Sequence, residues 1–155
     1  MINLENLFSA CWIMDCYYYS WINNNNKRFN RQMVVAQNYK KRDLEKHLNN
    51  YIDATILYIK VEKVIFIIND SDLEEYDRNL YDKGNLIDKY WRDMSLYVVT
   101  VRTKVNNYNE ELDIQCIAPI DIENSELKKR IISKCIKKIE INQVNMHEDC
   151  WLKKN

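Results

Sequence analysis

Glycine and proline are nearly absent from this chain, which has one of each among 155 residues. A phosphate-binding loop or a dinucleotide-binding fingerprint needs several glycines close together, so both are excluded. Turns must instead be built with Asn and Asp, which tolerate the left-handed conformation. The residues that dominate, Asn, Ile, Lys and Tyr, have A/T-rich codons. We infer an A/T-rich genome, as found in large DNA viruses, phages, other mobile elements and some bacteria and protists.

An excess of charge of one sign is also lacking, because 23 Lys and Arg balance 23 Asp and Glu. No long-range field therefore draws the whole chain toward nucleic acid or an anionic membrane, and either would need a local patch. The amino terminus has no basic segment, and Glu5 and Asp15 interrupt its apolar run, so neither a signal peptide nor a membrane span is expected. Five cysteines without regular spacing indicate a reducing, cytoplasmic setting, in the host cell if the source is viral.

Length and composition are those of one globular domain, with 46% hydrophobic and 30% charged residues. We expect residues 1–155 to form a single α+β domain, with four or five helices packed on a mainly antiparallel sheet of about four or five strands. No internal repeat is visible.

Helices are predicted from apolar spacing and from capping residues. Ser71 and Glu74 form a capping box, and Gly84 is suited to a C-terminal cap. The predicted helices span residues 4–22, 42–53, 71–84, 85–94, and from Asn124 or Ser125 to about 139.

Strands are predicted where β-branched residues gather or where apolar residues alternate. Residues 31–37 form a short candidate, and the run 55–69 forms one strand or two. Residues 96–105 and 112–118 are expected to pair as an antiparallel hairpin through a polar turn.

The predicted first helix carries aromatic residues outside its main apolar face. Trp12, Cys16 and Tyr19 follow at i, i+4 and i+7, so this flank should be covered by the domain, by a second copy or by a partner. Trp and Tyr dominate the energetics of protein interfaces. The leading hypothesis is a non-enzymatic protein-binding effector, namely an inhibitor, an antitoxin or a host-modulating protein, which contacts a host or cognate protein through these three residues.

Two alternatives belong to other functional classes. A nucleic-acid-binding protein would use the cations of the predicted helix 125–139, which lie opposite its apolar face. A metal-dependent nuclease would use the alternating polar residues of the strand that precedes Pro119, although any half-exposed strand shows the same pattern. The cations are Lys129, Arg130, Lys134 and Lys137, and the polar strand residues are Glu111, Asp113 and Gln115.

The spacing of the Cys and His residues does not match that of a zinc site or of a thiol-dependent enzyme. On a helix Cys11 and Cys16 would point to different sides, and His147 with Cys150 is at most half of a zinc site. A thiol nucleophile needs a histidine base, and His47 belongs to the apolar face of its own helix. We therefore expect no catalytic residue, no metal and no cofactor.

Overall fold

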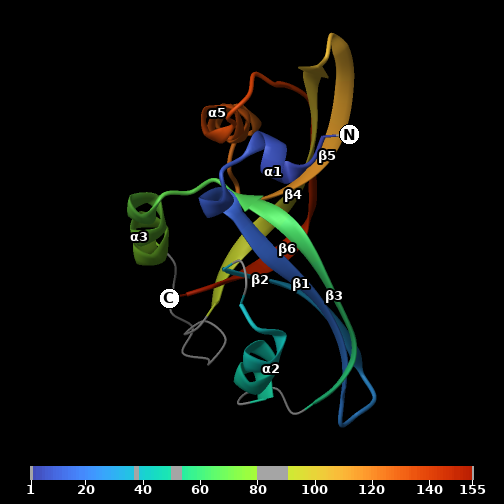
Figure 1. Cartoon of the computed structure of the whole chain (residues 1–155). Helices are drawn as coiled ribbons and strands as arrows, with labels where there is room; N and C mark the ends of the chain where they lie inside the picture. Colours follow the sequence, from blue (N-terminus) through green and yellow to red (C-terminus); the bar gives the residue numbers. More distant parts are fainter. Residues whose placement is uncertain (1, 37–38, 50–53, 80–90, 155) are drawn as a thin grey trace.

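Six strands of the computed structural model close into a barrel, in the order β1-β2-β6-β4-β5-β3 (Figure 1). The structure describes residues 2–36, 39–49, 54–79 and 91–154. The strands are β1 (Ile13–Asn23), β2 (Arg28–Ala36), β3 (Ala54–Phe66), β4 (Trp91–Val105), β5 (Tyr108–Ala118) and β6 (Glu140–Lys153). The helices are α1 (Leu4–Leu7), the 3₁₀ turn η1 (Ala10–Trp12), α2 (Lys41–Asn49), α3 (Asp70–Asn79) and α5 (Asn124–Lys134).

The expected α+β architecture is wrong, because the chain is mostly strand and the strands form a closed barrel. Two three-stranded antiparallel sheets make it up, with β1 between β2 and β3 and with β4 between β5 and β6. Two short parallel contacts join the sheets, and each has two residue pairs. They are Met33 with Trp151 and Val34 with Leu152 in β2·β6, and Ile65 with Cys116 and Phe66 with Ile117 in β3·β5.

The two halves of the barrel repeat one order of elements, strand-strand-helix-strand. The first half is β1, β2, α2 and β3, and the second is β4, β5, α5 and β6. In each half the first strand is central and pairs antiparallel with the other two. The two parallel contacts are equivalent under this repeat, because β2 corresponds to β5 and β6 to β3. The sequence shows no repeat, so the repetition is one of topology.

The predicted helix over residues 4–22 is the largest error in the sequence-based prediction. Only Leu4–Leu7 and Ala10–Trp12 are helical, and Ile13–Asn23 is β1. Both faces of β1 are buried over much of its length, so its apolar run lacks the alternation that marks a half-exposed strand. Its tyrosines, tryptophan and isoleucines favour a strand once such packing is available.

Two further helix predictions are wrong in their boundaries. Trp91 and Met94, assigned to a helix over 85–94, lie in β4, while Gly84 and residues 85–90 fall outside the described ranges. The last helix ends at Lys134 rather than near residue 139, because Cys135 is extended with φ −73° and ψ 133°.

Several local predictions are confirmed. β2, α2 and α3 form close to where they are expected, the run 55–69 contains one strand that ends at Phe66, and β4 and β5 form the hairpin. The capping box of Ser71 and Glu74 is wrong, because α3 begins at Asp70 and the Asp72 N–H donates to Asn69 Oδ1 at 2.9 Å. Asparagine does replace glycine in turns: Asn106 and Asn107, between β4 and β5, have φ of 51° and 69°, and Asn26 has φ of 62°.

Buried side chains form two clusters. The larger one includes Cys16, Val34, Leu152 and Ile117, together with Leu127 and Ile131 from α5. The second joins α2 to the barrel and is rich in aromatic rings. It contains Tyr17, Tyr19, Trp21, Met33, Val35, Leu44, Leu48 and Trp91. Figure 1 shows α2 and α5 near opposite ends of the molecule. Within the described ranges no helix has the length and apolar character needed to cross a bilayer.

Tyr19 tests the second cluster, because its ring is buried and its hydroxyl has no hydrogen-bond partner among the described residues. We expect Tyr19→Ala to lower the free energy of unfolding by about 3–5 kcal/mol, as for other buried aromatic rings. Tyr19→Phe should be neutral or stabilising, since it removes a buried polar group without breaking a bond. Urea unfolding of both variants measures the difference. A large loss in Tyr19→Phe would contradict this account of the hydroxyl.

Candidate functional site

The three residues predicted to bind a partner do not form one surface. Cys16 is in the larger core cluster, and Tyr19 is in the cluster beneath α2, so neither is available to a partner in this fold. Trp12 is half-buried, and the Nζ atom of Lys134 lies 4.2 Å from the centroid of its ring. Of the predicted set, only Trp12 reaches the surface.

The buried cysteine thiols have little nucleophilic character. Burial raises the pKa of Cys16 to about 12. Burial likewise raises the pKa of Cys116 and of Cys150 well above the ordinary value. A thiol with so high a pKa is protonated at neutral pH and does not attack a substrate.

The polar residues of β5 share one face of the strand, but each binds a different neighbour. Thr100 Oγ1 donates a hydrogen bond to Asp113 Oδ1 over 2.6 Å. Glu111 Oε1 accepts from Arg102 Nη2 at 2.8 Å and from Asn142 Nδ2 at 3.1 Å. Gln115 Nε2 donates to Glu62, so the set proposed for a nuclease does not converge on one point. Among the residues that the structure describes, no three of His, Cys, Asp or Glu are grouped to hold a metal ion.

Gln115 belongs instead to a polar network that links β1, β3 and β5. The Tyr18 hydroxyl donates to Gln115 Oε1 at 2.5 Å, and Lys60 Nζ lies 2.5 Å from Glu62 Oε1. The bond from Lys60, with a smaller contribution from Gln115, lowers the pKa of Glu62 despite its partial burial. Burial raises the pKa of Tyr18. The network lies beside the β3·β5 contact and ties the two sheets together.

The four cations predicted for nucleic acid are dispersed. Arg130 bridges α5 to α3 through Asp72 at 2.7 Å and also binds Glu126 at 2.9 Å. Lys134 lies over Trp12, and Lys129 is exposed on α5. Lys137 lies beyond the end of the helix, so the expected basic ridge does not exist.

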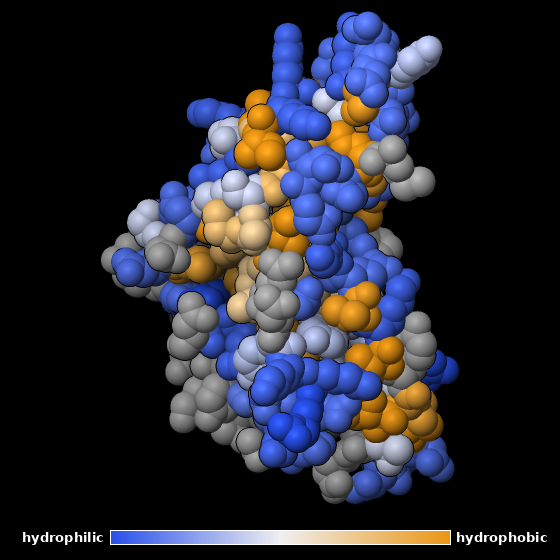
Figure 2. Space-filling model, in the orientation of Figure 1, coloured by the Kyte–Doolittle hydropathy of each residue, from blue (hydrophilic) through white to orange (hydrophobic). Residues whose placement is uncertain are grey.

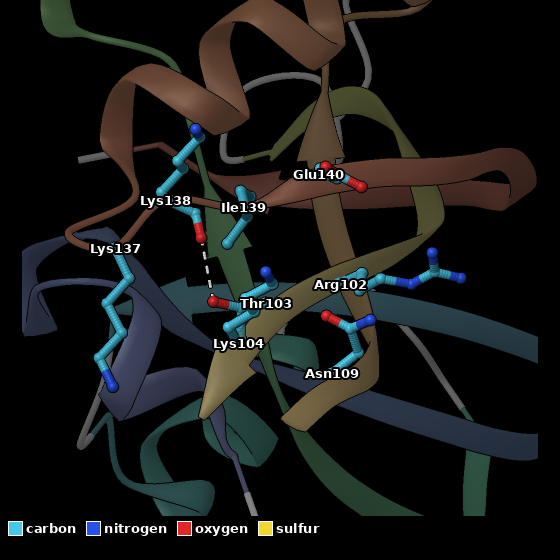
Figure 3. A pocket seen from close by; sticks show the side chains of 8 residues that line it. All are labelled: Arg102, Thr103, Lys104, Asn109, Lys137, Lys138, Ile139 and Glu140. Carbon is cyan, nitrogen blue, oxygen red and sulfur yellow. Dashed lines mark hydrogen bonds between the residues drawn. The ribbon is translucent and has the colours of Figure 1, made fainter. Parts of the chain in front are cut away.

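Lys137 instead lines a cavity of about 520 Å³ between the β4–β5 hairpin and the segment that joins α5 to β6 (Figure 3). The sequence pattern does not predict this site, because its residues come from separate parts of the chain. The lining residues are Arg102, Thr103, Lys104, Asn109, Lys137, Lys138, Ile139 and Glu140.

A second cavity, of about 460 Å³, lies where β2 and β6 separate. Its carboxylates, Asp93, Glu148 and Asp149, face one cation, Arg31, which lies 5.4 Å from the centroid of the Trp151 ring. This cavity is therefore acidic, in contrast to the first.

Strand β3 carries an exposed apolar strip that the sequence pattern did not predict. Leu57 and Val61 are 48% and 52% exposed, and Ile59 is half-buried beside them. A bulge at Ser20 and Trp21 leaves Leu57 without an opposite residue in β1. Figure 2 shows apolar atoms gathered at the lower right, where β1 and β3 run in Figure 1. We call Leu57, Ile59 and Val61 the β3 strip.

Within the described part of the chain, the edge of β3 that faces away from β1 is largely unpaired. β5 pairs with β3 only at Ile65 and Phe66. From Ala54 to Val64, β1 is its single strand partner among the described residues. The β3 strip therefore lies along an edge that can accept another strand.

Comparison of the chain with protein-family models, with curated proteins and with solved structures found no match.

Thiol accessibility tests the burial of the cysteines. In the native protein we expect Cys11, which is exposed, to react rapidly with a thiol-specific reagent and half-buried Cys135 to react slowly. Cys16, Cys116 and Cys150 should react only after unfolding, because they are buried and protonated. Absorbance during the labelling measures each phase, and Cys11→Ser should remove the fast one. Rapid labelling of all five cysteines would contradict the structure.

The Glu62 network should make stability depend on pH. Because the folded-state pKa of Glu62 is lowered from 4.5, its contribution is present above that value and is lost as the pH falls through the folded pKa. We expect Glu62→Gln to be less stable than the parent at neutral pH, with a smaller difference in acid. Urea unfolding at several pH values measures both effects. An equal loss at every pH would contradict the role of the charged carboxylate.

Proposed function

We propose that this protein is a non-enzymatic binding protein that captures an extended segment of another protein along the edge of β3. In this proposal it acts as an inhibitor, antitoxin or host-modulating effector of a virus, phage or other mobile element. The observation that carries the proposal is the unpaired edge of β3 beside the exposed side chains of Leu57 and Val61.

The main chain of β3 supplies the first part of the interaction. The strand has 13 residues, and alternate N–H and C=O groups between Ala54 and Val64 point away from β1. An added strand would satisfy these groups with main-chain hydrogen bonds, which is how many domains bind extended peptides.

The side chains supply the second part. Leu57 and Val61 would lose exposed apolar surface on binding, at roughly 25 cal/mol per Å². Lys60, Glu62 and Lys63 place charges among these apolar residues, and charges on an edge strand disfavour unselective strand pairing. These charges are paired within the chain, Lys60 with Glu62 at 2.5 Å and Lys63 with Glu5 at 2.6 Å, so the apolar side chains and the main chain carry the proposed contact.

The polar residues of β5 and the buried thiols are arranged in a way that favours a binding function over a catalytic one. Glu111, Asp113 and Gln115 are held by separate neighbours, and the pKa values of the buried thiols are raised. Trp12, the remaining anchor of the sequence-based hypothesis, packs under Lys134, whose Nζ atom lies 4.2 Å from the centroid of its ring. Exposed Ile136 follows on the same segment, where its N–H donates to the Leu7 carbonyl at 2.8 Å. This smaller surface is the comparison site for the test.

The test is capture of a partner from the cells in which the protein is produced naturally, followed by measurement of its affinity. Leu57→Asp with Val61→Asp should weaken binding at least tenfold, because two carboxylates would replace the apolar contact. Met146→Asp with Ile132→Asp is the matched control, since both side chains are exposed on other elements. Circular dichroism and thermal melting establish that both double variants fold.

Three outcomes would overturn the β3 proposal. They are the absence of any specific partner, equal weakening in the control variant, and loss of binding in Trp12→Ala while the β3 variant binds normally. A second copy of the chain found as the sole partner would place β3 in a homodimer and remove the effector role.

A further inference from the structure

We propose that the cavity beside the β4–β5 hairpin binds the phosphate backbone of single-stranded nucleic acid, with the ring of Tyr108 stacking on a base. Four of the eight lining residues are cations, namely Arg102, Lys104, Lys137 and Lys138, and one is a carboxylate, Glu140. The volume of about 520 Å³ is within the usual range for a site that holds one small ligand or one nucleotide.

The cavity forms because β6 does not pair with the last residues of β4. The last recorded pair between them is Arg102 with Glu140, whereas β4 continues to Val105. The segment 137–139 lies beside this end of β4, and Thr103 Oγ1 donates a hydrogen bond to the Lys138 carbonyl at 3.0 Å. Ile139 is 7% exposed and anchors the segment in the core.

The lysines therefore project from a backbone that is held in place. Figure 3 shows Lys137 and Lys138 on this segment, with Arg102 and Asn109 on the hairpin strands. A site whose backbone is already ordered loses less conformational entropy when it binds a ligand.

The charges of the cavity are not balanced. Arg102 is bound to Glu111 at 2.8 Å, so its charge is largely compensated. Lys104, Lys137 and Lys138 are exposed, and none of them forms an ion pair with a residue that the structure describes. A chain of phosphates on the side of Thr103 can neutralise Lys137 and Lys138 and release its condensed counterions.

Tyr108 adds an exposed aromatic ring near the cavity. Such a ring can stack on a nucleic-acid base, whereas an inorganic anion has no flat surface for it to contact. Its side chain is 76% exposed, and it follows the Asn106–Asn107 turn. Tyr108 lies opposite Val105, and alternation along β4 puts it on the same sheet face as Thr103, whose hydroxyl binds the 137–139 segment. The same alternation puts Lys104 on the other face, so Tyr108 shares its face with the segment that carries Lys137 and Lys138. Tyr108 lies outside the lining of the cavity, beyond Thr103 on the hairpin. A basic groove next to an exposed aromatic ring is the usual arrangement for single-stranded nucleic acid.

A single strand fits this arrangement better than a duplex. The bases of a duplex are stacked on one another, so their faces are not available to Tyr108. The zero net charge of the chain confines the attraction to the local patch, and binding should therefore depend on these few side chains.

The experiment measures fluorescence anisotropy of a labelled strand of about ten nucleotides, as DNA and as RNA, with the full-length protein. Binding should weaken as salt rises from roughly 50 to 200 mM. Lys137→Glu with Lys138→Glu should weaken binding at least tenfold and reduce the salt slope by about 1.4, since each contacted phosphate of a single strand contributes about 0.7. Tyr108→Ala should weaken binding about tenfold with the salt slope unchanged.

The matched control is Lys40→Glu with Lys46→Glu, which makes the same change of charge on exposed lysines in or next to α2. It should leave affinity within about twofold of the parent. Equal weakening by this control, or no binding at the lowest salt, would overturn the site. Preference for a duplex, or competition by inorganic phosphate as effective as that by an unlabelled strand, would overturn the assignment to single-stranded nucleic acid.

Discussion

The structure depends on two short parallel contacts, each of two residue pairs, that join the antiparallel sheets into a barrel. Two residue pairs contribute little to the stability of each contact. Apolar packing around the pairs stabilises the closed barrel more. Val34, Leu152, Ile65, Cys116 and Ile117, all in these pairs, are almost completely buried. Beside the β3·β5 contact, Tyr18, Gln115 and Glu62 add hydrogen bonds between the sheets. Closure is therefore decided by side chains that lie far apart in the sequence.

The proposed binding surfaces lie where the pairing between neighbouring strands stops short. Because β5 pairs with only the end of β3, most of one β3 edge stays available beside Leu57 and Val61. Because β6 begins at Glu140, the end of β4 is left beside the 137–139 segment, where the basic cavity forms. The topological repeat thus has two unlike halves: β3 presents an apolar strip, whereas the region around the start of β6 presents lysines.

Local patterns in the sequence were sufficient to predict those elements that have one apolar face and one polar face. α2 has an apolar face formed by Leu44 and Leu48, and the β4–β5 hairpin alternates on either side of a turn made by two asparagines. β1 was predicted as a helix because it is buried on both faces, so its periodicity carries no signal. Trp12, Cys16 and Tyr19 were grouped on that helix, and in the strand Cys16 and Tyr19 are separated into different core clusters.

By itself, the sequence determined those local elements whose two faces differ, such as α2 and the β4–β5 hairpin, the use of asparagine in left-handed turns and the absence of a glycine-rich phosphate loop. These properties depend on neighbouring residues and on backbone conformation. The tertiary structure decided barrel closure, the burial of Cys16 and Tyr19, and the meeting of Lys137 with Arg102 and Lys104. Such juxtapositions depend on which strands pair, and strand pairing is set by packing between distant segments rather than by the order of residues within any one of them.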